Sequence, residues 1–242
     1  MNVKTEAIVL NKIKYSDNSY ITNIFSRETG KTAVFLRAAK SNKAAYKPGQ
    51  FFPLNVVDVE LTINSVRNIQ NLKHCSNVFS AYNMCSDVYK SSVAQFIAEL
   101  MSKALSDNQT DKDLYDYLRN LISQLENPQI PSQNMHLLFL KDFAKYLGFE
   151  ITNNHSESTP FFNLREGMFL PVYTTDEESM DVELSELFSN LLELHIDNIR
   201  LFNTSYANRK QLLSRLLLYY RIHIDNFPEI KSIKVLNEVF SD

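Results

Sequence analysis

The sequence predicts an α+β protein in which a small β-barrel is followed by an α-helical domain. Hydrophobic residues recur with a strand-like period up to about residue 80 and with a helical period after it. The net charge changes sign at the same place. Residues 1–80 carry eleven lysines and arginines against five aspartates and glutamates, a net charge of +6, whereas residues 81–242 carry fourteen against twenty-three, a net charge of −9. We therefore expect two domains, 1–80 and 81–242, of which the first faces a polyanion.

Five short segments among the first eighty residues are typical of strands. They are compact and apolar, rich in aromatic and β-branched residues, or alternate apolar with acidic side chains. The segments are Glu6–Leu10, Tyr20–Phe25, Lys31–Leu36, Val57–Leu61 and a weaker run at Ile69–His74. Because closure removes the exposed edges of so small a sheet, we expect a closed barrel of the OB type.

After residue 80 the apolar residues follow the i, i+3, i+4, i+7 spacing of amphipathic helices. Helices are expected at about 93–105, 114–125, 131–147, 184–195 and 207–224, with a short last helix capped by Ser232. His195 falls on the apolar stripe of its helix, which favours a core or boundary histidine over a catalytic base. Residues 150–181 are polar and irregular, and we expect a loop or a short hairpin there.

The sequence lacks the motifs of the common catalytic sites. Its four glycines are too far apart for a phosphate loop or a dinucleotide turn, and neither GxSxG nor HExxH occurs. His74, Cys75 and Cys85 offer three ligands where a structural zinc site usually takes four, so both cysteines are expected to be small core hydrophobes. We expect no enzyme and no catalytic residue, metal site or cofactor.

The segment Lys31–Lys47 is the most informative for function. It contains five cations and no acidic residue, and Phe35 and Tyr46 lie among them. Spaced cations can follow a phosphate backbone while aromatic rings stack on unpaired bases. A lysine-rich loop that is only solvated is the alternative, but the position after the third strand of an OB-type barrel favours nucleic acid. The candidate DNA-binding residues are Lys31, Arg37, Lys40, Lys43, Tyr46 and Lys47, with Lys12 and Lys14 in the first turn extending the same basic face.

Several segments, in order along the chain, resemble the RecO family of bacterial recombination mediators. They are Tyr15-Ser16-Asp17, Ile21–Lys31, Arg37–Ser41, Gln50–Leu54, Tyr219-Tyr220-Arg221 and Pro228–Ser232 with Leu236. Many members hold zinc with four cysteines after the helix end that corresponds here to Leu147-Gly148. Residues 161–169 contain no cysteine, so we expect no metal site, and packing of Phe161, Phe162 and Phe169 in its place.

The resemblance implies an OB-fold domain and a helical domain that bind single- and double-stranded DNA. It further implies annealing of complementary strands and loading of recombinase on gapped DNA during repair. The implied partners are RecR and the acidic C-terminal tail of the single-stranded DNA-binding protein.

Two alternatives to a DNA-binding mediator remain. One is a protein-interaction adaptor in which DNA contact is secondary, which the acidic helical part favours. The other is a hydrolase or transferase, for which no site is recognisable. The N-terminus lacks a secretion signal, and no run reaches the ~18 apolar residues of a membrane span. With only two cysteines, these features predict a cytoplasmic protein. The DNA role that the resemblance implies adds the expectation that it is nucleoid-associated.

Overall fold

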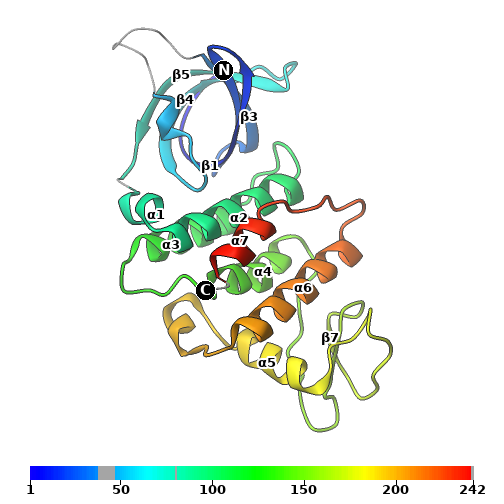
Figure 1. The fold of residues 1–242 in the computed structure, drawn as a ribbon. Helices are drawn as coiled ribbons and strands as arrows, with labels where there is room; N and C mark the ends of the chain where they lie inside the picture. The colour runs from blue at the N-terminus through cyan, green and yellow to red at the C-terminus, as the bar shows by residue number, and fades with distance from the viewer. Residues whose placement is uncertain (38–46, 80, 241–242) are drawn as a thin grey trace. The chain divides into compact units, whose positions relative to one another are not determined.

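The computed structural model of the protein describes residues 1–37, 47–79 and 81–240. Its first part is a closed barrel of five strands in the order β1-β2-β3-β5-β4 (Figure 1), which confirms the predicted barrel. All neighbouring strands are antiparallel except β3 and β5. The strands are β1 (Asn2–Ser16), β2 (Ser19–Ser26), β3 (Gly30–Arg37), β4 (Val56–Thr62) and β5 (Ile69–Asn77).

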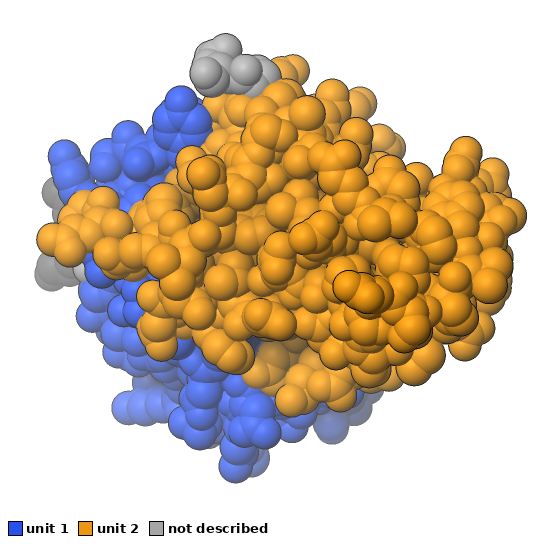
Figure 2. All heavy atoms as spheres, turned by 90° about the horizontal axis from the view of Figure 1, so that it is seen from below, with its two compact units in different colours: residues 1–127 blue, residues 128–242 orange. Residues whose placement is uncertain are grey.

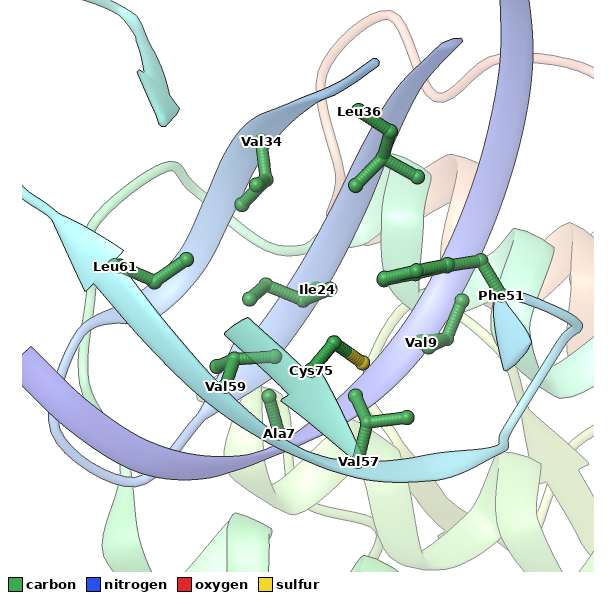
Figure 3. Packing of buried hydrophobic residues seen from close by; sticks show 10 residues of the cluster. All are labelled: Ala7, Val9, Ile24, Val34, Leu36, Phe51, Val57, Val59, Leu61 and Cys75. Atoms are coloured by element: carbon green, nitrogen blue, oxygen red, sulfur yellow. The ribbon is translucent and has the colours of Figure 1, made fainter. Parts of the chain in front are cut away.

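Alternate residues of the strands fill the barrel, because successive side chains of a strand point to opposite faces. The predicted inward face of β4, with Val57, Val59 and Leu61, is confirmed, since all three are buried. Phe51, which follows the short 3₁₀ helix η1 (Pro48–Gln50), also points into the core. Figure 3 shows the cluster: Ala7, Val9, Ile24, Val34, Leu36, Phe51, Val57, Val59, Leu61 and Cys75.

Strand β1 is longer than predicted and continues to Ser16, where it pairs with Ser19 of β2. Lys12 and Lys14 therefore lie within a strand, so the prediction that they lie in a turn was wrong. The register shifts between Val9 and Asn11, and such an irregularity breaks the period-2 pattern by which a strand is recognised.

Helices occupy most of the remaining chain, as predicted. They are α1 (Tyr82–Ser86), α2 (Val88–Ala104), α3 (Lys112–Glu126), α4 (Met135–Tyr146), α5 (Val182–Leu192), α6 (Tyr206–His223) and α7 (Ile233–Val239), with a 3₁₀ helix η2 (Ile196–Leu201). Helix α4 begins with Asn134 as its N-cap, four residues later than expected. Helix α5 ends before His195, which is exposed at the start of η2, so the predicted core or boundary position of this histidine was wrong. Among the described helices, none combines the length and hydropathy needed to cross a membrane.

The contacts within the chain divide it into two compact units, Met1–Asn127 and Pro128–Asp242, coloured separately in Figure 2. The first three helices thus group with the barrel, although the change from strands to helices lies near residue 80. Helix α2 lies against the barrel within this first unit (Figure 1).

Residues 150–181 of the second unit contain the short hairpin of β6 (Phe161–Asn163) and β7 (Met168–Leu170). Phe162 packs edge-on against Phe169 and Phe188, with ring centroids 5.0 and 4.7 Å apart. The side chain of Asn154 holds β7 by bonding the N–H and the C=O of Phe169 at 2.8 and 3.0 Å. Aromatic packing and an amide bridge therefore hold this segment. Phe161 is only half-buried and contacts Tyr173.

The two cysteines differ in their surroundings. Cys75 is buried in the barrel core, where burial and the nearby charge of Asp58 raise the pKa of its thiol to about 12. Cys85 is exposed in α1, so the prediction that it is a core residue was wrong. Within the part of the chain that the structure describes, no three His, Cys, Asp or Glu side chains come together to hold a metal ion.

Candidate nucleic-acid interface

Lys31, at the start of β3, is directed to the helical layer of its own unit. Its Nζ donates to the carbonyl oxygens of Ser102 and Leu105 at 3.0 and 2.6 Å, and lies 3.0 Å from Oδ1 of Asp107. Its side chain is only 13% exposed. The ammonium thus satisfies carbonyl groups at the C-terminus of α2, which the helix itself leaves without donors. Lys31 therefore anchors the barrel to α2.

Backbone groups of β3 also contact the α2–α3 loop directly. The N–H of Asn108 donates to the carbonyl of Lys31 at 2.8 Å. Gly30 has a φ of +62°, and a Cβ added there would collide with the backbone carbonyl of Gln109. Only glycine fits this position, because both the conformation and the space exclude a side chain.

Arg37 lies at the other end of β3, six residues or about 20 Å along the strand from Lys31. It pairs with Ser19, beside the end of the β1–β2 hairpin where Lys14 pairs with Tyr20. Lys12 places its Nζ over the ring of Tyr20, 5.6 Å from the centroid. The structure therefore brings Lys12, Lys14 and Arg37 to one end of the β1–β2–β3 sheet and places Lys31 elsewhere. We call this region the far end.

The cations of the far end lie on two faces of the sheet. By register, Lys14 shares a face with Tyr20 and Leu36, which is the face that continues into the barrel core. Arg37 alternates with Leu36 and lies on the outer face. Lys12 and Lys14 thus do not extend the face that carries Arg37, but flank the same end of the sheet from its other side.

Four apolar residues share the outer face with Arg37. Ile13, Ile21 and Phe35 are direct neighbours in the register, and the ring of Tyr15 meets that of Phe35 edge-on at 6.0 Å. We call Ile13, Tyr15, Ile21 and Phe35 the outer apolar face. From the sequence, only Phe35 of these four is a candidate for contact with nucleic acid. The alternation Lys12-Ile13-Lys14-Tyr15 indicates Ile13 and Tyr15 once β1 is extended to Ser16.

Lys47 is exposed immediately before η1, where its N–H donates to the side chain of Gln50 at 2.6 Å. Within residues 1–37, 47–79 and 81–240, neither Arg37 nor Lys47 has a carboxylate at ion-pairing distance. Arg27, by contrast, pairs with Asp116 at 2.9 Å. The other predicted residues, Lys40, Lys43 and Tyr46, lie outside the described residues.

Beside β1 and β4 lies a surface pocket whose lining has more acidic than basic side chains. This acidic pocket, of about 490 Å³, is lined by Lys4, Thr5, Glu6, Glu28, Asp58, Val59, Glu60 and His74. Glu6 accepts hydrogen bonds from the Tyr115 hydroxyl and Arg119 Nε at 2.7 and 2.6 Å. Burial and this bond to Glu6 raise the pKa of Tyr115. Glu60 pairs with Lys4 at 3.6 Å, and Glu6 pairs with Arg119. Among the described residues, no cation pairs with Glu28 or Asp58, the other two carboxylates of the pocket lining. The pocket is therefore less favourable for a phosphate backbone than the far end.

Comparison with known proteins agrees with this architecture. The family model described as "Recombination protein O N terminal" matches residues 1–81, and "Recombination protein O C terminal" matches residues 85–232. The DNA repair protein RecO of Flavobacterium psychrophilum is 32% identical over 244 residues, covering 100% of both chains. That of Azobacteroides pseudotrichonymphae is 30% identical over 240 residues, 99% of this chain and 100% of the relative. The chain therefore belongs to the RecO family of DNA repair proteins.

Proposed function

We propose that this protein binds single- and double-stranded DNA at the far end of its barrel, anneals complementary strands and promotes recombinase loading on gapped DNA. The observation that carries the proposal is the concentration of cations there. Arg37 has no carboxylate partner among the described residues, and strands β2 and β3 contain no acidic residue. Lys47, which precedes η1, likewise has none within the described part of the chain, and we propose that it adds to the same interface. Lys12 and Lys14 complete the described part of the interface, and Lys40, Lys43 and Tyr46 are proposed to add to it. DNA contact is thus assigned to the 1–80 domain and not to 81–242.

Such a surface binds DNA mainly by releasing the counterions that surround the phosphates. Screening two phosphate backbones at once also lets complementary bases search for one another, so annealing requires no covalent step. We accordingly propose a mediator and not an enzyme. Lys31 does not belong to the proposed phosphate contacts, because its ammonium is already bound by two carbonyl oxygens and Asp107.

A salt titration tests the proposal. The affinity for a fluorescent single-stranded oligonucleotide is measured by anisotropy over a range of salt concentrations, for the wild type, Arg37→Glu and Arg37→Glu/Lys40→Glu. Each lost phosphate contact is expected to lower the slope of log K against log [salt] by about 0.7. Both variants should therefore bind more weakly and with a flatter slope.

Arg67→Glu is the matched control, because it makes the same charge change at an exposed arginine of the same barrel. Since Ile69 pairs with Ala33, Arg67 lies toward the start of β3 and away from Arg37. It should retain the wild-type slope. Wild-type binding that is absent or independent of salt would overturn the proposal, as would equal losses in the Arg37 and Arg67 variants.

We also propose RecR and the acidic C-terminal tail of the single-stranded DNA-binding protein as partners, in keeping with the family. The alternative function is an adaptor that holds such proteins while DNA contact is secondary, and the −9 charge of residues 81–242 favours it. A repair assay distinguishes the mediator from the adaptor. A protein with Arg37 and Lys40 reversed that still captures its partners and still supports repair would favour the adaptor.

A further inference from the structure

The outer apolar face is unusual for the outside of a small barrel. One face of an antiparallel sheet normally packs on the core while the other is polar and solvated. Here the outer face is apolar as well, although Leu36 and Val34 already fill the core behind Phe35. Ile13 and Tyr15 nevertheless remain 59% and 67% exposed. Large apolar side chains gathered on a surface are typical of an interaction site.

We propose that the outer apolar face is a stacking platform for unpaired bases, with Tyr15 and Phe35 as the rings that receive them. The inference rests on the proposed function and adds to it a reason for preferring single strands. The edge-on contact of the two rings leaves the Tyr15 ring largely exposed, so a base can lie against it. Ile13 and Ile21 extend the apolar surface across β1 and β2.

The charge around this face argues for DNA as the occupant rather than an apolar peptide. Arg37 follows Phe35 by two residues on the same face of β3, about 7 Å along the strand, where it can contact a phosphate beside a stacked base. The sequence holds no Asp or Glu within residues 11–16, 19–26 or 30–37. The nearest acidic residue along the chain, Asp17 in the β1–β2 turn, is paired with Lys14 at 3.9 Å.

A duplex cannot use such a platform in the same way. Its bases are already stacked on one another inside the helix, so their flat faces are not available to side chains. The cations of the far end serve single and double strands alike, whereas the outer apolar face serves only strands with unpaired bases. The proposal therefore predicts that removing a ring weakens binding to single strands and leaves binding to duplex unchanged.

The experiment compares Tyr15→Ala and Tyr15→Phe with the wild type on three probes. These are a fluorescent oligothymidine, a strand of equal length without bases, and a duplex. Loss of one stacking contact should weaken oligothymidine binding by about 5- to 150-fold. Binding to the abasic strand and the duplex should not change, and neither should the salt slope. Tyr15→Phe keeps the ring and should bind as the wild type does.

Tyr82→Ala is the matched control, since Tyr82 is 72% exposed in α1 of the same unit. It should retain wild-type affinity for every probe. Tyr15→Ala that binds oligothymidine like the wild type would overturn the platform, as would equal losses on all three probes. Failure of the proposed function itself has a different signature, because the wild type would then bind none of the probes at low salt.

Photocrosslinking gives a second readout that does not depend on a variant. Oligonucleotides carrying 5-iodouracil are irradiated on the wild-type protein, which is then digested with trypsin. Cleavage after Lys14 and Arg27 releases residues 15–27, and cleavage after Lys31 and Arg37 releases residues 32–37. Crosslinks at Tyr15 or Phe35 are expected, and crosslinks found only in other peptides would overturn the proposal.

Discussion

Replacing Lys31 with methionine distinguishes a structural lysine from a DNA-binding one. Methionine keeps most of the apolar stem and removes the ammonium. The carbonyl oxygens of Ser102 and Leu105, now 3.0 and 2.6 Å from Nζ, then lose this donor, and Asp107 loses its ion-pair partner. Lys31 comes from the most cationic segment of the chain, so a count of charges would assign it to DNA.

The size of the effect follows from these contacts. A hydrogen bond from a charged donor contributes about 1.5–3 kcal/mol to stability, and a cation near a helix C-terminus adds about 0.3–1 kcal/mol. The pair with Asp107 adds less than about 1 kcal/mol, because the aspartate side chain is 75% exposed. Since one ammonium serves all three partners, we expect a total loss of about 2–4 kcal/mol. This lowers the midpoint of thermal unfolding by about 4–16 °C.

Calorimetry and the salt titration together provide the assay. Lys31→Met should unfold at a lower temperature and bind DNA with the wild-type salt slope at temperatures where it is folded. Arg37→Glu should show the reverse, with unchanged stability and a flatter slope. A Lys31→Met protein of wild-type stability whose slope has fallen would refute the anchoring role.

Three further predictions concern stability. Gly30→Ala should lower the free energy of unfolding by at least about 2 kcal/mol, because its φ of +62° and the carbonyl of Gln109 both oppose a Cβ. Gly49→Ala should leave it nearly unchanged, and urea denaturation compares the two variants. Burial, with the nearby charge of Arg209, lowers the pKa of His136 to about 3, so the unfolded chain takes up a proton that the folded chain does not. Stability should therefore be full above about pH 6.5 and fall as the pH drops toward 3, by about 2 kcal/mol between pH 7 and pH 5; equal pH dependence in His136→Gln would argue against this cause. Phe162→Ala should lower the free energy of unfolding by about 3–5 kcal/mol, because its ring packs against Phe169 and Phe188. A zinc chelator should leave the melting temperature of the wild type unchanged. A lower melting temperature in the chelator would show that metal stabilises the fold.

The barrel was predictable because its strands carry local patterns. Val57, Val59 and Leu61 alternate with acidic residues, and this alternation alone fixes which face is buried. The length of β1 was not predictable in this way, because the register shift after Val9 interrupts the period. The outer apolar face could not be predicted for the same reason. Only the pairing of β1 with β2 shows that Ile13 and Tyr15 lie on the same face as Ile21 and Phe35.

The role of Lys31 depends on contacts that no local pattern contains. Its partner Asp107 lies 76 positions away in a loop whose path is set by the packing of α2 and α3. A count of charges treats all cations alike. Lys31 is nevertheless bound by carbonyl oxygens at the end of α2, whereas Arg37 is not. The prediction for His195 failed for a related reason. The helical spacing of apolar residues continues past the end of α5, because η2 also buries hydrophobic residues, so the spacing alone does not show where the helix ends.

The contact between Gly30 and Gln109 has a consequence for comparing sequences. Backbone meets backbone there, so no side chain can compensate for a change on the opposite side. Methods that search for pairs of positions changing together would find no covariation at this junction, although it joins the barrel to the α2–α3 loop. Position 109 is free to vary in residue type, whereas a relative that replaces the glycine must have rebuilt the path of the loop.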